Sequence, residues 1–232
     1  MLRPQTIDVT TSSVAATMER VTTTVDGPVS RRERNKAEKQ RRILAAARSL
    51  FATKPFDEVT TQEVAETADV ATGTLFNYAT SKAELLMWVA NGFTEEVLIG
   101  RIADSVAGLT DSDAAVDHIC ALLEPIVEVA TRRPENFAAY TRESLFGPPG
   151  PHRSEALDVL AALETRIGEI LVADPHRQLR QGLTPREAGR LVWSSMCMEL
   201  LGMSLGHRCT RDQRAVLRDY VDSLVHGMLV GP

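Results

Sequence analysis

The chain has 232 residues, of which 44% are hydrophobic and 25% are charged, the composition of an ordinary soluble globular protein. A chain of this length can bury a substantial core without disulfides or a structural metal. Its three cysteines, Cys120, Cys197 and Cys209, are odd in number and far apart, which argues against a disulfide framework. No apolar run reaches the roughly 18 residues that a membrane span needs, and the N-terminus lacks a signal-peptide pattern. We therefore expect a cytoplasmic protein that makes no membrane contact.

The net charge of −5 conceals one strongly basic segment. Between Arg31 and Lys54, nine lysines and arginines face only two acidic residues, Glu33 and Glu38, which gives a local net charge of +7. A basic block on an otherwise acidic chain is typical of a protein that offers one end to nucleic-acid phosphates. The alternative interpretation is an ordinary solvated helix face.

The first part of the chain predicts an arm followed by a helix. Residues 1–30 are rich in threonine and serine without an apolar period, which predicts a disordered arm. From Arg34 to Ala52 apolar residues recur at helical spacing, and Pro55 then ends the helix. Few segments alternate polar and apolar residues as strands do, so we expect an all-α fold.

Two short helices are predicted next. Thr60 and Glu63 have the spacing of a capping box and open the first. Asp69-Val70 makes a turn, and a second short helix runs from about Thr72 to Tyr78. Two short helices joined by a tight turn behind a basic helix are the layout of a helix-turn-helix, whose second helix enters the DNA major groove.

The remaining chain also has a helical pattern. Ser81 and Glu84 form another capping box that opens a long helix, and Thr184-Pro185 with Glu187 opens a later one. The further helices are predicted near residues 112–131, 134–146, 153–173, 185–205 and 211–229.

The second short helix supplies the side chains that would read DNA. Leu75 and Ala79 lie four residues apart and are expected to face the core, which turns the opposite side outward. Threonine and asparagine can bond base edges, and glycine allows a close backbone approach. The predicted DNA contacts on this segment are Thr72, Gly73, Thr74, Asn77 and Tyr78. Thr61, Gln62 and Lys82 are predicted to contact phosphates. Alternatively, these side chains only cap helices or fill the core.

Three sequence stretches carry a family resemblance: Thr60–Ala65, Asp69–Tyr78 and Ser81–Leu86. Together they resemble the N-terminal domain of the TetR family of repressors, with the specific match over about residues 35–90. The resemblance implies a helix-turn-helix domain at residues 31–81 and a ligand-binding and dimerisation domain at residues 82–232. It also implies a dimer formed through the last two helices, in which a small molecule repositions the two helix-turn-helix domains.

This sequence departs from the family pattern at several positions. Asp69 replaces the usual glycine of the turn, and Ala71 replaces the usual serine cap. Aspartate can adopt the left-handed turn conformation, whereas alanine cannot cap a helix. Phe76 replaces a tyrosine, so no phosphate hydrogen bond is carried over to it.

Large apolar side chains in the C-terminal part are candidates for a ligand pocket. They are Trp88, Phe93, Phe137, Tyr140, Trp193 and Met196. Such side chains favour a mainly apolar effector, although they are also ordinary core residues.

A hydrolase motif occurs near the end of the chain and is rejected. Residues Gly202–Gly206 spell G-x-S-x-G, but the nucleophile elbow needs a strand before the serine, and here a helix is predicted. We expect no catalytic residue, and a helical hydrolase built on Ser204 is the alternative. The histidines are scattered, so no metal site or cofactor is expected. The leading hypothesis is a homodimeric repressor that binds double-stranded DNA at a palindromic operator and is released by a small effector.

Overall fold

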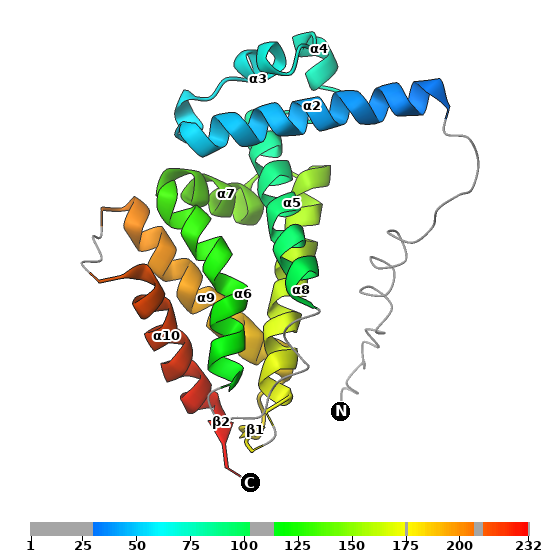
Figure 1. Ribbon diagram of the computed structural model, residues 1–232. Coiled ribbons are helices and arrows are strands. Elements are labelled where there is room, and N and C mark those ends of the chain that lie inside the picture. The colour runs from blue at the N-terminus through cyan, green and yellow to red at the C-terminus, as the bar shows by residue number, and fades with distance from the viewer. Residues whose placement is uncertain (1–29, 103–113, 175, 207–210, 232) are drawn as a thin grey trace, which may run out of the picture. The chain divides into compact units, whose positions relative to one another are not determined.

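The computed structural model describes residues 30–102, 114–174, 176–206 and 211–231. These residues are almost entirely helical, which confirms the predicted all-α fold (Figure 1). The elements are α2 (Arg31–Thr53), the 3-10 turn η1 (Phe56–Glu58), α3 (Thr61–Thr67), α4 (Thr72–Leu75), α5 (Lys82–Ile102), α6 (Ala114–Arg132), α7 (Pro134–Phe146), α8 (Pro151–Val172), β1 (Gln178–Leu179), α9 (Pro185–Ser204), α10 (Gln213–Met228) and β2 (Leu229–Val230). The predicted arm at residues 1–30 lies outside the described residues except for Ser30.

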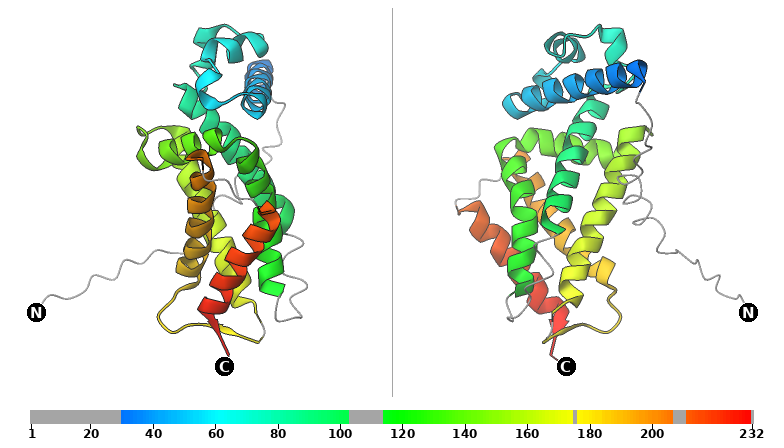
Figure 2. Two further views of the ribbon diagram at one scale, coloured as in Figure 1. Left: turned by 90° about the vertical axis from the view of Figure 1, so that its left-hand side faces the viewer. Right: turned by 45° about the vertical axis from the view of Figure 1, so that its right-hand side comes forward.

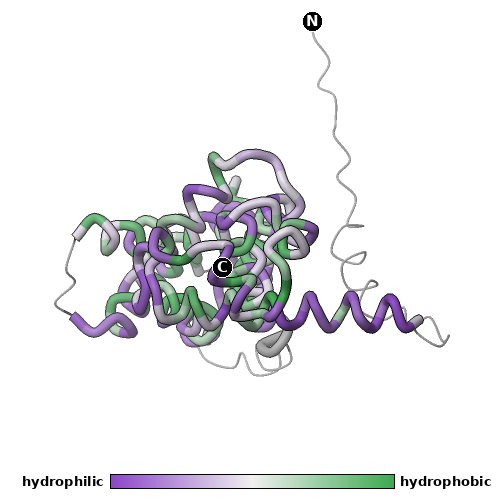
Figure 3. Tube along the Cα trace, turned by 90° about the horizontal axis from the view of Figure 1, so that it is seen from above, coloured by the Kyte–Doolittle hydropathy of each residue, from purple (hydrophilic) through white to green (hydrophobic). Residues whose placement is uncertain are grey.

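The chain divides between Ala37 and Glu38 into two compact units, and the apolar cores, the candidate DNA contacts and the cavity described below lie in the second. In the first unit, the Ser30 hydroxyl accepts a hydrogen bond from the Glu33 backbone N–H, and the Glu33 carboxylate accepts one from the Ser30 N–H. This reciprocal pair begins α2 three residues before the predicted start. The early turns of α2 are predominantly hydrophilic (Figure 3).

The capping boxes predicted at Thr60 and Ser81 are each half formed. The hydroxyl of Thr60 accepts from the backbone N–H of Glu63 at 3.1 Å, and that of Ser81 accepts from Glu84 at 3.1 Å. The carboxylates bond elsewhere, however, and that of Glu63 pairs with Lys54 at 2.5 Å. The Glu63 carboxylate therefore forms an ion pair with Lys54 next to α2 and does not accept from the N-cap backbone N–H.

Two apolar cores hold the second unit together. One is shared by α2, α3, α4 and the start of α5, with Ala139 of α7 joining it. The other is shared by α6, α8, α9 and α10, which run alongside one another in both views of Figure 2. No helix of the described chain is long and apolar enough to cross a membrane.

Helices α8 and α9 pack against each other through glycines. A Cβ atom added at Gly189 would lie 1.9 Å from the carbonyl oxygen of Glu164, and one added at Gly168 would lie 2.3 Å from that of Pro185. Only a residue without a side chain allows backbones to approach this closely. At the start of α9, Thr184 and Glu187 form the complete capping box that the sequence predicted.

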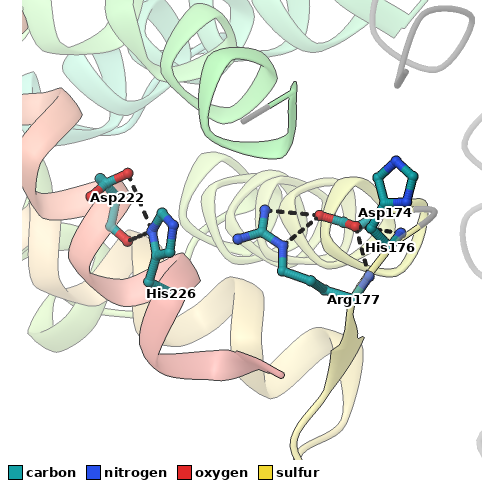
Figure 4. A network of polar contacts seen from close by, with 5 residues as sticks. All are labelled: Asp174, His176, Arg177, Asp222 and His226. Atoms are coloured by element: carbon teal, nitrogen blue, oxygen red, sulfur yellow. Dashed lines mark hydrogen bonds and ion pairs between the residues drawn. The ribbon is translucent and has the colours of Figure 1, made fainter. Parts of the chain in front are cut away.

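A short ribbon closes the far end of the helical core, where β1 pairs antiparallel with β2. The turn before β1 is organised by Asp174, whose carboxylate accepts from the backbone N–H groups of His176 and Arg177 at 2.8 and 2.9 Å (Figure 4). The same carboxylate pairs with the Arg177 side chain. Burial raises the pKa of Asp174, but these hydrogen bonds and the Arg177 charge outweigh burial, so the pKa is lowered.

Candidate nucleic-acid interface and ligand cavity

The turn between α3 and α4 has the geometry expected from its aspartate. Asp69 adopts a left-handed backbone conformation with φ 52°, as predicted. Its carboxylate also accepts a hydrogen bond from Arg42 Nη1 at 3.0 Å, which ties the turn to α2. Arg42, one of the nine basic residues counted between Arg31 and Lys54, therefore forms an ion pair with Asp69 inside the protein.

Helix α4 is shorter than predicted. It ends at Leu75, and the chain continues to Tyr78 through turns in which the N–H of Asn77 bonds the carbonyl of Thr74 and that of Tyr78 bonds Leu75. Ala71 precedes the helix and has no side-chain oxygen to cap it, as expected. Because it lacks this cap, the helix is short, and tighter turns follow it.

The reading segment, Thr72–Tyr78, presents the predicted face. Leu75 and Ala79 are buried, as expected from their spacing. The five candidate DNA contacts lie on the other side or at its edges: Thr72, Gly73 and Asn77 are exposed, and Thr74 and Tyr78 are half-buried. A Cβ atom added at Gly73 would meet no described atom within 4 Å, so packing inside the chain does not require glycine there.

The three candidate phosphate contacts differ in their surroundings. Thr61 is half-buried at the start of α3, and Gln62 is exposed, with its amide donating to Glu66 at 2.9 Å. The ammonium of Lys82 lies 4.4 Å from the centroid of the Phe56 ring and donates to the carbonyl of Asp57 at 3.3 Å. Lys82 therefore packs on η1, and its role toward phosphate stays a prediction.

A cavity of about 280 Å³ lies where the end of α2 meets α5, α6, α7, α8 and α9. Most of its wall is apolar. Four of the six predicted pocket residues line it: Phe93, Phe137, Tyr140 and Trp193. Among the described residues the wall does not include Trp88 or Met196, because Trp88 stacks on the ring of His152 at 5.2 Å and Met196 is buried in the core.

The cavity wall also carries polar side chains that the sequence reasoning did not find. They are Arg48, Thr94, Arg132, Arg133 and Asn136. A search for large apolar residues could not detect them, although the basic pair just before Pro134 was a visible signal. Arg48 comes from α2, so the first helix of the candidate DNA-binding head forms part of the wall.

The start of α7 holds the end of α2 by hydrogen bonds. Asn136 Nδ2 donates to the carbonyls of Phe51 at 2.8 Å and Lys54 at 3.1 Å. Arg133 donates to the carbonyls of Thr53 at 2.6 Å and Ala52 at 3.4 Å. The last carbonyls of a helix have no partner within it, so two cavity residues satisfy the end of α2.

A chain of hydrogen bonds runs from the cavity to the reading segment. Tyr140 donates to Asn91 Oδ1 at 3.2 Å, and Asn91 Nδ2 donates to the carbonyl of His152 at 2.8 Å. The His152 N–H donates to the Glu84 carboxylate, and its ring nitrogen Nε2 lies 3.1 Å from the carbonyl oxygen of Tyr78. Burial raises the pKa of Tyr140 to about 12, so its hydroxyl stays a donor at neutral pH.

Comparison with known proteins agrees with this geometry. Residues 43–87 match the model of the bacterial regulatory proteins of the tetR family. The chain carries a TetR-family DNA-binding domain. It also has the fold of TetR-family transcriptional regulators, as solved structures with matching helical domains show. No curated protein sequence matches the chain at significant similarity.

The solved structures extend the TetR likeness over most of the chain. A TetR regulator from Rhodococcus sp. RHA1 has 23% identity and a TM-score of 0.60, and the match covers 82% of this chain and 97% of that one. The Thermus thermophilus repressor FadR, solved with lauroyl-CoA, has 25% identity and a TM-score of 0.62 over 83% and 96% of the chains. FadR from Bacillus subtilis, solved with stearoyl-CoA, has 17% identity and a TM-score of 0.59 over 82% and 99%.

The rejected hydrolase motif lies at the end of a helix. Ser204 is the last residue of α9, and its hydroxyl donates to the carbonyl of Leu201 at 2.7 Å. A helix therefore precedes the serine where the nucleophile elbow needs a strand. Regulators with the TetR fold are in general not enzymes, in agreement with this placement.

Proposed function

We propose that the chain is a homodimeric repressor that binds a palindromic DNA operator through α3 and α4 and leaves it when an amphipathic acyl ligand fills the cavity. The observation that carries the proposal is the position of the cavity. Its wall includes Arg48, Phe51 and Ala52 of α2, so a bound ligand would touch the DNA-binding head directly. A ligand shifts an equilibrium only if it binds one state better than the other, and direct contact with the head supplies such a difference.

The exposed face of the reading segment supports DNA recognition. Asn77 is exposed and Thr74 is half-buried, and side chains of both kinds can bond base edges. A Cβ atom added at Gly73 would meet no described atom within 4 Å, which supports a close approach of a phosphate or base there. In a dimer, two such segments about one DNA turn apart, roughly 34 to 36 Å, would meet two half-sites of a palindrome.

Exposed apolar side chains on the last two helices support dimerisation there. Four of the ten large hydrophobic side chains that are exposed in the described residues lie on or next to α9 and α10: Leu191, Met198, Leu205 and Tyr220. A dimer formed through these helices would remove such side chains from water.

The lining of the cavity supports an amphipathic ligand with an acyl chain. Apolar side chains surround most of the volume. Arg48, Arg132 and Arg133 also line it and bond Glu96, Glu128 and the end of α2, so an anionic head would share these guanidinium groups with partners inside the protein. The Thermus thermophilus repressor with 25% identity was solved with lauroyl-CoA, which has this chemistry. The proposal thus narrows the mainly apolar effector expected from the sequence to a long acyl chain with a charged end.

Fluorescence anisotropy with labelled DNA from beside the protein's own gene tests the proposal. We expect tight binding that weakens with salt, survives an excess of random DNA, and is lost on addition of lauroyl-CoA. Thr74→Ala and Asn77→Ala should relax base preference while the protein stays folded. Equal affinity for random DNA at both salt concentrations would reject the repressor assignment.

A further inference from the structure

The side-chain amide of Asn136 has a fixed orientation in the cavity wall. The residue is 8% exposed, and its Nδ2 donates to the carbonyls of Phe51 and Lys54. Both partners are oxygens that can only accept, so the nitrogen of the amide must face them. The oxygen Oδ1 is therefore the only group of Asn136 left to meet a ligand.

The Oδ1 atom is buried and receives no hydrogen bond from any residue that the structure describes. The neighbouring donors of the cavity are committed elsewhere: Arg133 bonds the end of α2, Tyr140 bonds Asn91, and Thr94 bonds the carbonyl of Ala90. A buried acceptor without a partner is costly, and such a group is satisfied when a donor enters the site.

Arg48 contributes the complementary group. Its Nε is also buried and donates to no acceptor in the described part of the chain, while Nη2 of the same guanidinium pairs with Glu96 at 2.6 Å. Asn136 and Arg48 both line the cavity, so two of its lining residues carry a buried polar group without a partner among the described residues, one an acceptor and one a donor. A ligand that satisfies both must carry a donor and an acceptor.

We propose that Asn136 is a specificity-determining residue that selects acyl ligands with a hydrogen-bond donor, an amide N–H or a hydroxyl, at the polar end of the chain. This inference rests on the proposed ligand function of the cavity. Simple esters and hydrocarbons of the same length fill the apolar volume but leave Oδ1 unpaired, and a site built to bond a donor rejects analogues that lack it. The bond also joins the ligand to the residue that holds the end of α2.

Two nearly isosteric probes test the inference. N-methyldodecanamide and methyl dodecanoate differ by one N–H replaced with an oxygen, and both affinities are measured by isothermal titration calorimetry on the full chain. We expect the wild type to bind the amide about fivefold more tightly or better, a preference that disappears in Asn136→Ala. Thr165→Val is the matched control, since Thr165 of α8 is not among the lining residues and its hydroxyl donates to the carbonyl of Ala161 at 2.8 Å; the preference should persist there.

A second pair of probes needs no variant, because Asn136 also supports α2 and its replacement can impair folding. N,N-dimethyldodecanamide keeps the carbonyl of the first amide and lacks only the N–H, so its affinity for the wild type should also be about fivefold weaker. Equal binding of the amide, the ester and the dimethyl amide would overturn the role of Asn136 and leave the ligand function intact. Lauroyl-CoA is titrated beside them: if it binds and none of the three probes does, this inference is overturned and the ligand function stands, and if lauroyl-CoA also fails to bind, both are overturned.

Discussion

The ring nitrogen Nε2 of His152 lies 3.1 Å from the carbonyl oxygen of Tyr78, which joins the first turn of α8 to the end of the reading segment. The other ring nitrogen, Nδ1, lies 2.7 Å from the Glu155 carboxylate. The His152 ring thus lies between the end of the reading segment and a carboxylate of its own helix, and its position fixes the distance between them.

Replacing His152 should loosen the reading segment. We expect His152→Ala to lower the free energy of unfolding by about 1–3 kcal/mol, because it removes buried hydrogen bonds and the stack on Trp88. DNA affinity should fall as well, as measured by anisotropy with the operator. Glu155→Gln is the control, since it keeps the ring and its bond to Tyr78. Unchanged DNA affinity in His152→Ala would show that this contact does not position the reading segment.

Gly73 should matter for DNA and not for folding. An added methyl group would meet open space within the described chain, so we expect Gly73→Ala to keep or raise the melting temperature. The same methyl group would obstruct the approach of DNA, and operator affinity should fall by about tenfold, or ~1.4 kcal/mol. A drop in stability together with unchanged affinity would contradict the proposed close approach.

Replacing Lys82 distinguishes its contact with Phe56 from the contact with a DNA phosphate that the sequence predicts. If its ammonium also contacts a phosphate, Lys82→Ala should weaken binding to all DNA sequences and lower the salt slope by about one. Loss of its contact with Phe56 should cost only about 0.5–1 kcal/mol of stability. The measurement is anisotropy at several salt concentrations beside a urea titration. A lower stability together with an unchanged salt slope would mean that Lys82 only packs on η1 and does not contact phosphate.

The close approach of α8 and α9 predicts a sharp contrast between two glycines. Gly189→Ala would place a carbon 1.9 Å from the carbonyl oxygen of Glu164, so the two backbones must separate. We expect a loss of about 2–4 kcal/mol in the free energy of unfolding. Gly227→Ala in α10 meets no described atom within 4 Å and should stabilise the helix by up to about 1 kcal/mol. Equal effects of the two changes in urea unfolding would refute the close approach.

Because of Asp174, the free energy of unfolding should depend on pH in the acidic range. Its pKa in the folded protein lies below the ordinary value of 3.8, so its contribution is present above that pH and is lost as the pH falls through the lowered pKa. Asp174→Asn should therefore cost about 1–3 kcal/mol at neutral pH, and this difference should shrink below pH 4. Melting temperatures of both proteins across this pH range provide the measurement. A difference that stays constant would mean that the charge of Asp174 contributes nothing.

Local signals predicted the helices well. Pro55, the threonine and serine caps and the Thr184 box set boundaries that the structure reproduces within a few residues, because capping depends on neighbours in sequence. The cavity was predicted only in part. Phe137 and Trp193 have the size that marks a pocket, but the positions of Asn136 and Arg48 in the wall depend on how α7 meets α2, which no local pattern encodes.

The shared wall of the cavity bears on how such regulators can diversify. Arg48, Phe51 and Ala52 belong to the same helix that positions the DNA-reading segment, and they also line the cavity. With the proposed ligand in this cavity, exchanging the head for that of another regulator would alter ligand preference along with operator choice. Under that proposal, the two specificities would change together.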